Sequence, residues 1–171
     1  MVLGFAVLLI IAGLAWAWHW RTHPTVFPEA GNQIGLTLDD GRRIVAVGVT
    51  YPYPGTGKTV SIESAAPRIL KNSADASFDF YICEQDLERP DGSALGMVVG
   101  TREFARYCPD AQPVQDGTDL KTGSVSPQQL VLVLRFGRQG RAVTEGVNLT
   151  YSTGLQSGTQ AVGPHLRIEF R

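Results

Sequence analysis

The segment LVLVLRF at residues 130–136 alternates leucine with valine, and Arg135 is its only charged residue. Successive side chains of a β-strand point to opposite faces of the sheet, so a strand that is apolar at nearly every position is buried on at least one face. Branched aliphatic residues also favour the extended conformation. The segment therefore predicts a central strand, with a β-rich domain built around it.

Shorter strand-like segments lie on both sides of this run. Apolar residues alternate with polar or small ones at residues 34–38, 44–51, 59–63, 77–83, 143–151 and 166–170, a short apolar run covers 95–99, and turns or connections are expected at 113–127 and around Gly154 and Gly158. Asp39, Asp40 and Gly41 between the first two segments predict a β-hairpin. Within the domain only residues 101–107 favour a helix, which Pro109 ends. This pattern predicts an all-β fold, an immunoglobulin-like antiparallel β-sandwich, with a small barrel as the alternative.

The chain begins with a segment that is apolar throughout. Residues 2–18 contain no ionisable side chain, and Trp16, Trp18 and Trp20 lie at the end of the segment. A helix of about 20 apolar residues can cross the hydrocarbon core of a bilayer, and indole rings favour the headgroup region. We therefore expect residues 1–21 to form a transmembrane helix, with the lipid bilayer as its partner.

Two further regions follow this anchor. Residues 22–32 contain prolines and a glycine, and they predict an extended tether because proline prevents the helix from continuing. Residues 33–171 are long enough to enclose one hydrophobic core and are expected to form the β-sandwich domain. Ala15 and Ala17 also fit the cleavage pattern of a signal peptide, but we favour an uncleaved anchor because no basic segment precedes the apolar run.

The two cysteines, Cys83 and Cys108, belong neither to a C-x-x-C motif nor to a histidine-rich cluster. In an anchored β-rich domain, such a pair predicts one disulfide formed outside the cytoplasm, with two buried free thiols as the alternative. Arg21 beside the anchor favours a cytoplasmic domain, but one charge orients a long domain weakly. We expect a single-pass plasma-membrane protein with an extracytoplasmic domain. No metal site is predicted, because His165 is the only histidine of the domain.

Charge and motifs argue against nucleic acid and nucleotide as partners. The formal net charge is −1, with acidic and basic residues interspersed, so the sequence carries no electrostatic footprint for nucleic acid. Residues 52–59 resemble a phosphate-binding loop, but Pro52 occupies the position of its first glycine. The residues after Lys58 alternate like a strand, whereas a phosphate-binding loop leads into a helix. We interpret the segment as a turn and expect no cofactor.

Catalytic residues are not predicted. His165 has no Gly-x-Ser-x-Gly nucleophile elbow to act with, and the acidic residues between 84 and 91 do not follow the spacing of a calcium-binding loop. A hydrolase centred on His165 is therefore only a third hypothesis. The chain is predicted not to be an enzyme.

The last quarter of the chain carries a distinct pattern. It consists of Glu145, Gly146, Val147, Thr150, Tyr151, Gly154, Gly158, Thr159, Gln160 and Gly163. This pattern resembles uncharacterised single-pass membrane proteins of the actinobacterial envelope, and the resemblance implies an anchored protein with an immunoglobulin-like extracytoplasmic domain but no known activity. From the residues themselves, Gly154, Gly158 and Gly163 permit positive φ in a long hairpin connection, and we expect Tyr151 to pack at the edge of the core with its hydroxyl bonded to the backbone.

We predict that the protein is a binding or accessory subunit of a cell-envelope protein assembly, with other membrane or envelope proteins as its partners. The alternative is a module that binds cell-wall glycan or lipid. Such a module needs a concave aromatic patch, for which Tyr51, Tyr53, Phe78 and Tyr81 are the candidates.

Overall fold

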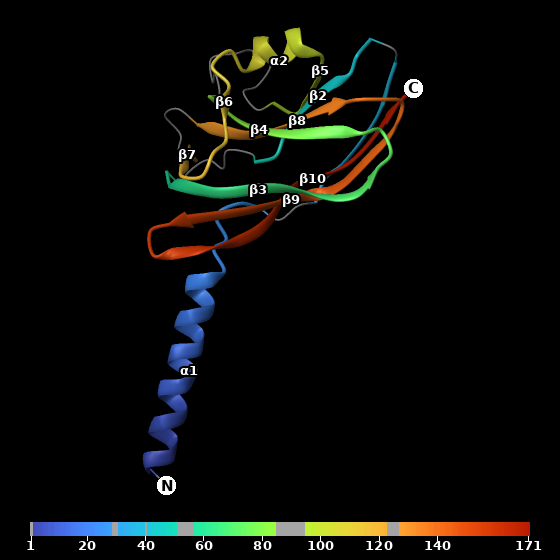
Figure 1. Cartoon of the computed structure of the whole chain (residues 1–171). Helices are drawn as coiled ribbons and strands as arrows, with labels where there is room; N and C mark the ends of the chain where they lie inside the picture. Colours follow the sequence, from blue (N-terminus) through green and yellow to red (C-terminus); the bar gives the residue numbers. More distant parts are fainter. Residues whose placement is uncertain (1, 29–30, 40, 51–56, 85–94, 123–126) are drawn as a thin grey trace.

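The computed structural model describes residues 2–28, 31–39, 41–50, 57–84, 95–122 and 127–171, with side chains from Leu8 on. A long N-terminal helix leads into a β-sandwich, as Figure 1 shows. The described chain is mostly β, in two five-stranded sheets whose strands are antiparallel except for the pair β1 and β10. The predicted β-sandwich is confirmed at this level.

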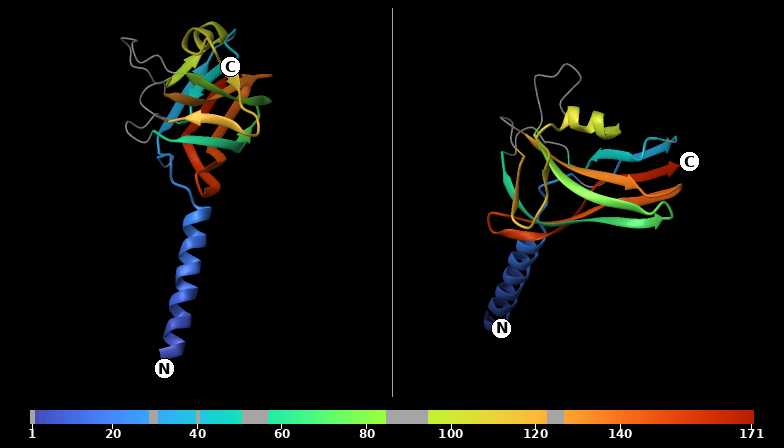
Figure 2. Two further views of the ribbon diagram at one scale, coloured as in Figure 1. Left: turned by 90° about the vertical axis from the view of Figure 1, so that its left-hand side faces the viewer. Right: turned by 45° about the horizontal axis from the view of Figure 1, so that its top comes forward.

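The two sheets and two helices form layers. Sheet A contains, in spatial order, β1 (Gln33–Leu38), β10 (Gln156–Phe170), β9 (Gly140–Thr153), β3 (Thr59–Asn72) and β7 (Thr118–Lys121). Sheet B contains β5 (Met97–Val99), β2 (Ile44–Gly48), β8 (Gln128–Phe136), β4 (Ala76–Glu84) and β6 (Gln112–Pro113). Helix α2 (Thr101–Tyr107) covers the outer face of sheet B, whereas helix α1 (Val2–Thr22) lies on the side of sheet A (Figures 1 and 2).

Strand β8 is the centre of sheet B and is buried on both faces. Leu130, Leu132 and Leu134 point into the core between the sheets. Val131 and Val133 point the other way, into a second cluster beneath α2. None of the five side chains is more than 1 % exposed. The predicted central strand is confirmed, and α2 explains why its second face is apolar as well.

The predicted hairpin between residues 34 and 51 is wrong. Strand β1 lies in sheet A, where it runs parallel to β10 and pairs Gln33 with His165. Strand β2 lies in sheet B between β5 and β8. The chain therefore crosses from one sheet to the other. Alternation identifies a half-buried strand but does not identify its partner, and the partner of β1 lies at the far end of the sequence.

Several strands differ in extent from the predicted segments. Strand β3 continues through Pro67 to Asn72, with shifts of register on either side of that proline. Residues 113–127, expected to hold only turns, include β7. The expected connection after residue 151 is a tight turn at Gly154, because β9 and β10 continue on both sides of it. The polar residues of these strand ends face solvent, which gives them the composition of a loop. Helix α2 has the predicted bounds.

Helix α1 matches the predicted anchor segment to within one residue. Its described large apolar side chains, from Leu8 to Trp20, are 47–71 % exposed. Among the residues that the structure describes, no helix is both long and apolar enough to span a membrane.

The segment after α1 is extended, as predicted, but it does not stand away from the domain. Phe27 is only 6 % exposed and belongs to the core between the sheets, with Val26 packed against the same core. The sequence did not predict this packing: an aromatic residue three positions after Pro24 has enough apolar surface to hold the tether on the sandwich.

Candidate functional site

The predicted aromatic surface is not one continuous patch in the described structure. Tyr51 and Tyr53 lie outside the described residues. Phe78 and Tyr81 both belong to β4, but they are three positions apart, so their side chains point to opposite faces of sheet B. Phe78 packs against the core between the sheets. Tyr81 packs edge-on against Phe104 of α2, with 5.7 Å between the ring centroids.

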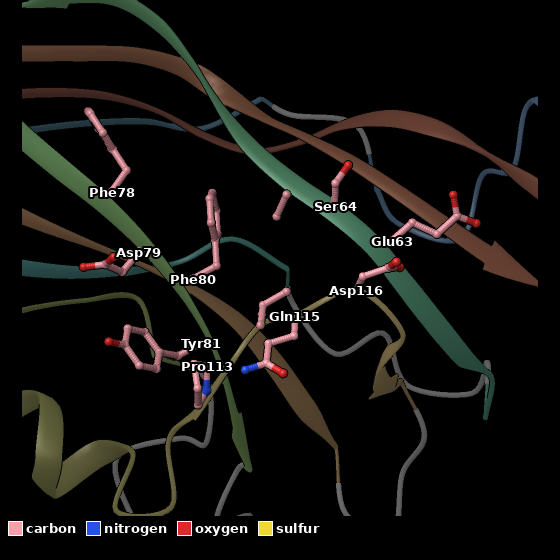
Figure 3. Close-up of a pocket in the computed structure, with 11 residues that line it drawn as sticks. Glu63, Ser64, Phe78, Asp79, Phe80, Tyr81, Pro113, Gln115 and Asp116 are labelled. Carbon is pink, nitrogen blue, oxygen red and sulfur yellow. The ribbon is translucent and has the colours of Figure 1, made fainter.

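Both residues nevertheless border a groove of about 410 Å³ at one side of the sandwich. Strand β3 forms one wall and β4 forms the other, and residues 113–116 close one end (Figure 3). The groove exists because β6 pairs with β4 only at Tyr81 and Ile82, which leaves the rest of that strand edge without a neighbouring strand in the described structure. Phe80 lies beside Phe78 in the wall.

The rim of this groove is acidic, but two of its carboxylates are engaged. Asp79 accepts a hydrogen bond from Arg135 at 3.2 Å, and the Tyr81 hydroxyl together with Asp79 raises the pKa of that guanidinium. Glu63 accepts a hydrogen bond from Ser157 at 3.2 Å. Apolar rings beside hydrogen-bonding groups are typical of the pockets in which proteins bind small ligands.

Cys83 and Cys108 form the predicted disulfide, with 5.3 Å between their Cα atoms. Both residues are buried, at 3 % and 2 % exposure, in the cluster beneath α2. The bond joins the end of β4 to the residue that follows α2. It therefore holds the covering layer on sheet B, and the alternative of free thiols is wrong.

A set of contacts that we call the tether clamp fixes the segment after α1. The Tyr151 hydroxyl accepts a hydrogen bond from the Val26 backbone at 3.0 Å and donates one to Gln160 Oε1 at 2.8 Å. Gln160 Nε2 in turn donates to the Phe27 carbonyl at 2.6 Å. The rings of Phe27 and Tyr151 meet edge-on, with centroids 5.2 Å apart. Burial raises the pKa of Tyr151, although the Val26 N–H opposes this shift.

The predicted hydrogen bond of Tyr151 with the backbone is thus confirmed, whereas sequence reasoning missed the roles of Gln160 and Phe27. The alternation of β9 and β10 places positions 151 and 160 on the same face, and strand pairing brings them near each other. The glycine-rich composition around Gly154 and Gly158 hides this signal, because it indicates a connection where β9 and β10 in fact continue.

The tip of the β9–β10 hairpin also touches the end of α1. Gln156 Nε2 donates a hydrogen bond to the Trp20 carbonyl at 2.8 Å. A Cβ atom at Gly158 would overlap the Thr22 carbonyl oxygen, so glycine permits this close approach. Of the three glycines that permit positive φ here, Gly154 (58°) and Gly163 (81°) adopt it, whereas Gly158 is not among the positive-φ glycines.

The other sequence motifs lie outside the groove and the tether clamp. His165 lies in β10, and its backbone N–H donates to the Asn32 carbonyl at 2.7 Å. Of the segment 52–59, the described part begins at Gly57 and enters β3 at Thr59, so a strand follows Lys58 as predicted. Of the acidic segment 84–91, all but Glu84 lies outside the described residues. Within the described ranges, no group of three or more His, Cys, Asp or Glu residues could hold a metal ion.

The fold and these contacts define a two-sheet β-sandwich with an N-terminal helix clamped to sheet A. Comparisons with protein-family models, with curated proteins and with solved structures find no match to this chain. The resemblance to actinobacterial envelope proteins therefore stays a prediction.

Proposed function

We propose that this protein is a membrane-anchored, extracytoplasmic β-sandwich that serves as a binding or accessory subunit of a cell-envelope protein assembly. One observation carries the proposal: a helix with exposed apolar side chains is joined to the sandwich by a segment whose Phe27 is buried in the core. Leaving a large aliphatic side chain in water forgoes about 1.5–3 kcal/mol of burial energy. A lipid environment removes that cost for the whole helix.

The dimensions of α1 support this role. Its 21 residues rise by about 1.5 Å each, which gives about 31 Å, close to the thickness of about 30 Å of a hydrocarbon core. Because no helix among the described residues is long and apolar enough to span a membrane, the proposal relies on residues 2–7, which are apolar by sequence, to complete the span. Trp16, Trp18 and Trp20 cluster at the end next to the sandwich, as side chains at the headgroup level do.

The disulfide supports an oxidising compartment, because cytosolic thiols are normally kept reduced. Thiol labelling in intact cells tests this part of the proposal. We expect Cys83 and Cys108 to resist an alkylating reagent until the protein is both denatured and reduced. Alkylation after denaturation alone would show free thiols and would contradict an extracytoplasmic domain.

Strand order supports the immunoglobulin-like part of the proposal. If β2, β3, β4, β8, β9 and β10 are named B to G, sheet B contains the order B-E-D and sheet A the order C-F-G. The same orders occur within the A-B-E-D and C-F-G sheets of a constant-type immunoglobulin domain. The chain departs from that domain in three ways. Strand β1, which precedes B, pairs with G and not with B; β5, α2, β6 and β7 lie between strands D and E; and the disulfide does not join strands B and F.

Flotation of the full chain with phosphatidylcholine vesicles tests the anchor. The wild type is expected to float with the vesicles after an alkaline carbonate wash. A Leu9→Glu/Leu14→Glu variant is expected to stay at the bottom, because a charged residue near the centre of an apolar helix costs about 2.5–3.5 kcal/mol or more. Leu155→Glu replaces a side chain that is 77 % exposed on the hairpin turn and serves as the control that still floats. Flotation of the double variant would contradict the anchor.

Co-purification tests the assembly. Full-length chain solubilised from its native membranes is expected to elute with other envelope proteins in a fixed ratio that survives size-exclusion chromatography. Elution as a monomer–detergent complex with no other protein would contradict the accessory-subunit role and leave the anchor intact.

The groove beside Phe78 favours a second candidate function, binding of envelope glycan or lipid. Phe78→Leu keeps an apolar side chain against the core but removes the ring face on which a sugar can stack. If the groove binds glycan, this variant is expected to lose retention on isolated cell-wall material while its unfolding midpoint changes little. Equal retention of wild type and variant would exclude Phe78 from binding.

A further inference from the structure

The outer face of sheet A carries a hollow of about 340 Å³, on the opposite side of that sheet from the core. Strand register pairs Val143 with both Lys71 and Arg167. Residues paired in this way point to the same face, so both cations stand beside Val143. Strands β3 and β10 flank β9, which places the two backbone positions roughly 10 Å apart.

The hollow is positively charged. Its described lining includes Lys71, Arg141 and Arg167 and contains no aspartate or glutamate. The formal net charge of the chain is −1, so this concentration of cations is local and does not reflect a basic protein. A site of this kind attracts anions, above all phosphates, to which guanidinium and ammonium groups donate charge-assisted hydrogen bonds.

Two carboxylates lie in register with lining residues, Glu145 with His165 and Glu169 with Arg141, and both already form ion pairs. Glu145 accepts a hydrogen bond from Arg68 at 2.7 Å. Glu169 forms ion pairs with Arg171 at 3.1 Å and with Arg141 at 3.3 Å, and these arginines lower the pKa of Glu169. Within the described part of the chain, neither carboxylate is therefore left to neutralise the remaining cations of the hollow.

Lys71 and Arg167 are those remaining cations. Among the described residues neither has an ion-pair partner. The residue paired with Arg167 on the neighbouring strand is Gly35, and a Cβ atom there would meet nothing within 4 Å. The side of the hollow next to Gly35 is thus open, and no side chain at that position covers Arg167. Leu70 at its rim is 66 % exposed.

The hollow also has a defined direction relative to α1. Sheet A lies on the side of the molecule from which α1 extends, whereas sheet B and α2 lie on the far side (Figures 1 and 2). If α1 is inserted in a bilayer, the outer face of sheet A is the face of the sandwich turned toward the headgroups. The tether clamp holds this orientation.

We propose that the outer face of sheet A docks on anionic phospholipid headgroups, with a headgroup phosphate between Lys71 and Arg167 and Leu70 at the boundary of the acyl region. Basic side chains next to an anionic leaflet are attracted to it, and exposed aliphatic residues add apolar contact. The inference rests on the proposed anchoring of α1.

Lysine footprinting of the full chain in lipid nanodiscs tests the proposal. We compare discs of phosphatidylcholine with discs that also contain phosphatidylglycerol, and measure the rate of Lys71 acetylation by mass spectrometry against Lys58, which does not line the hollow. Lys71 is expected to react about fivefold more slowly in the anionic discs. Arg167→Glu should remove most of this protection, whereas Arg102→Glu on the exposed surface of α2 should leave it unchanged.

The outcomes separate the two proposals. Failure to enter neutral discs would contradict the anchor. Entry into both kinds of disc with equal Lys71 reactivity would overturn the headgroup contact alone. A third arm adds inorganic phosphate to neutral discs: protection there equal to that in anionic discs would assign the hollow to a free anion and overturn its assignment to lipid.

Discussion

The Tyr151 hydroxyl forms a hydrogen bond that links the segment after α1 to the core. Tyr151→Phe keeps the buried ring but leaves the Val26 N–H without its acceptor. We expect a loss of about 1–3 kcal/mol in the free energy of unfolding, because a buried donor without a partner keeps its desolvation cost. Urea unfolding measures this loss. Thr150→Val, which removes one member of the exposed Thr150–Thr159 hydroxyl pair, is expected to change stability by less. Equal losses of stability in Tyr151→Phe and Thr150→Val would contradict the tether clamp.

The same hydroxyl gives the protein a predictable response to alkaline pH. Burial raises the pKa of Tyr151 above its ordinary value of 10.0. Above about pH 10 an unfolded chain therefore releases this proton while the folded chain retains it, so stability is present below that pH and falls as pH rises through the folded pKa. Wild type is expected to lose more stability between about pH 9 and 11 than Tyr151→Phe, measured by urea unfolding at each pH. Parallel pH profiles would contradict this prediction.

At the scale of elements, the contact between the hairpin and α1 depends on Gly158. Gly158→Ala brings a methyl group against the Thr22 carbonyl and Pro24, so we expect the end of α1 to move while the sandwich stays folded. Trypsin should then cut faster after Arg21, which limited proteolysis in detergent measures. Gly35→Ala is the matched control, because its Cβ has open space around it. Equal cleavage of both variants would contradict the close approach.

The disulfide belongs to the same scale because it joins two elements. Replacing Cys83 and Cys108 by alanine is expected to cost about 3 kcal/mol, since the bond closes a loop with a sequence separation of 25 in the unfolded chain. Reduction of the wild type should lower the unfolding midpoint by a similar amount. If reduction leaves the midpoint unchanged, the bond does not contribute to stability.

The positions of several elements were predictable from the sequence, and the strand partners were not. Alternation located β4, the continuous apolar run located β8, and the short segment before Pro109 located α2, because side-chain direction and helix stops are local properties. The neighbour of β1 is β10, more than a hundred residues later, and no local pattern contains that information. The polar ends of β9 and β10 have the composition of a loop, and strand pairing alone extends them.

The candidate sites also divide into those that the sequence alone predicts and those that depend on strand register. The cysteine pair could be predicted because no other cysteine competes for either partner. The cationic hollow could not be predicted, because Lys71 and Arg167 lie on different strands and meet only through the register on β9. Phe27 was missed because the prolines around it indicate a tether and say nothing of where an aromatic side chain packs.

At the scale of the whole molecule, the main property is that the sandwich has a fixed orientation relative to α1. Three contacts fix the end of α1 and the segment after it on the sandwich. They are the tether clamp, the hydrogen bond from Gln156 to the Trp20 carbonyl, and the close approach of Gly158 to Thr22. A binding domain on a free tether samples many orientations and pays for this freedom when it binds. A clamped domain presents the outer face of sheet A toward the membrane and α2 away from it before any partner arrives.

This relation predicts how the molecule tumbles. In lipid nanodiscs, the backbone amides of the wild-type sandwich are expected to relax with the rotational correlation time of the whole disc. Gln160→Ala removes the hydrogen bond to the Phe27 carbonyl but leaves the aromatic contact, so the sandwich should acquire faster motion of its own on α1. Gln128→Ala is the control. It removes a hydrogen bond that the Lys121 backbone N–H donates to Gln128 outside the tether clamp, so it should leave this relaxation unchanged. Nitrogen-15 relaxation measures both variants, and a wild-type sandwich that already tumbles independently would show that the clamp does not hold the orientation.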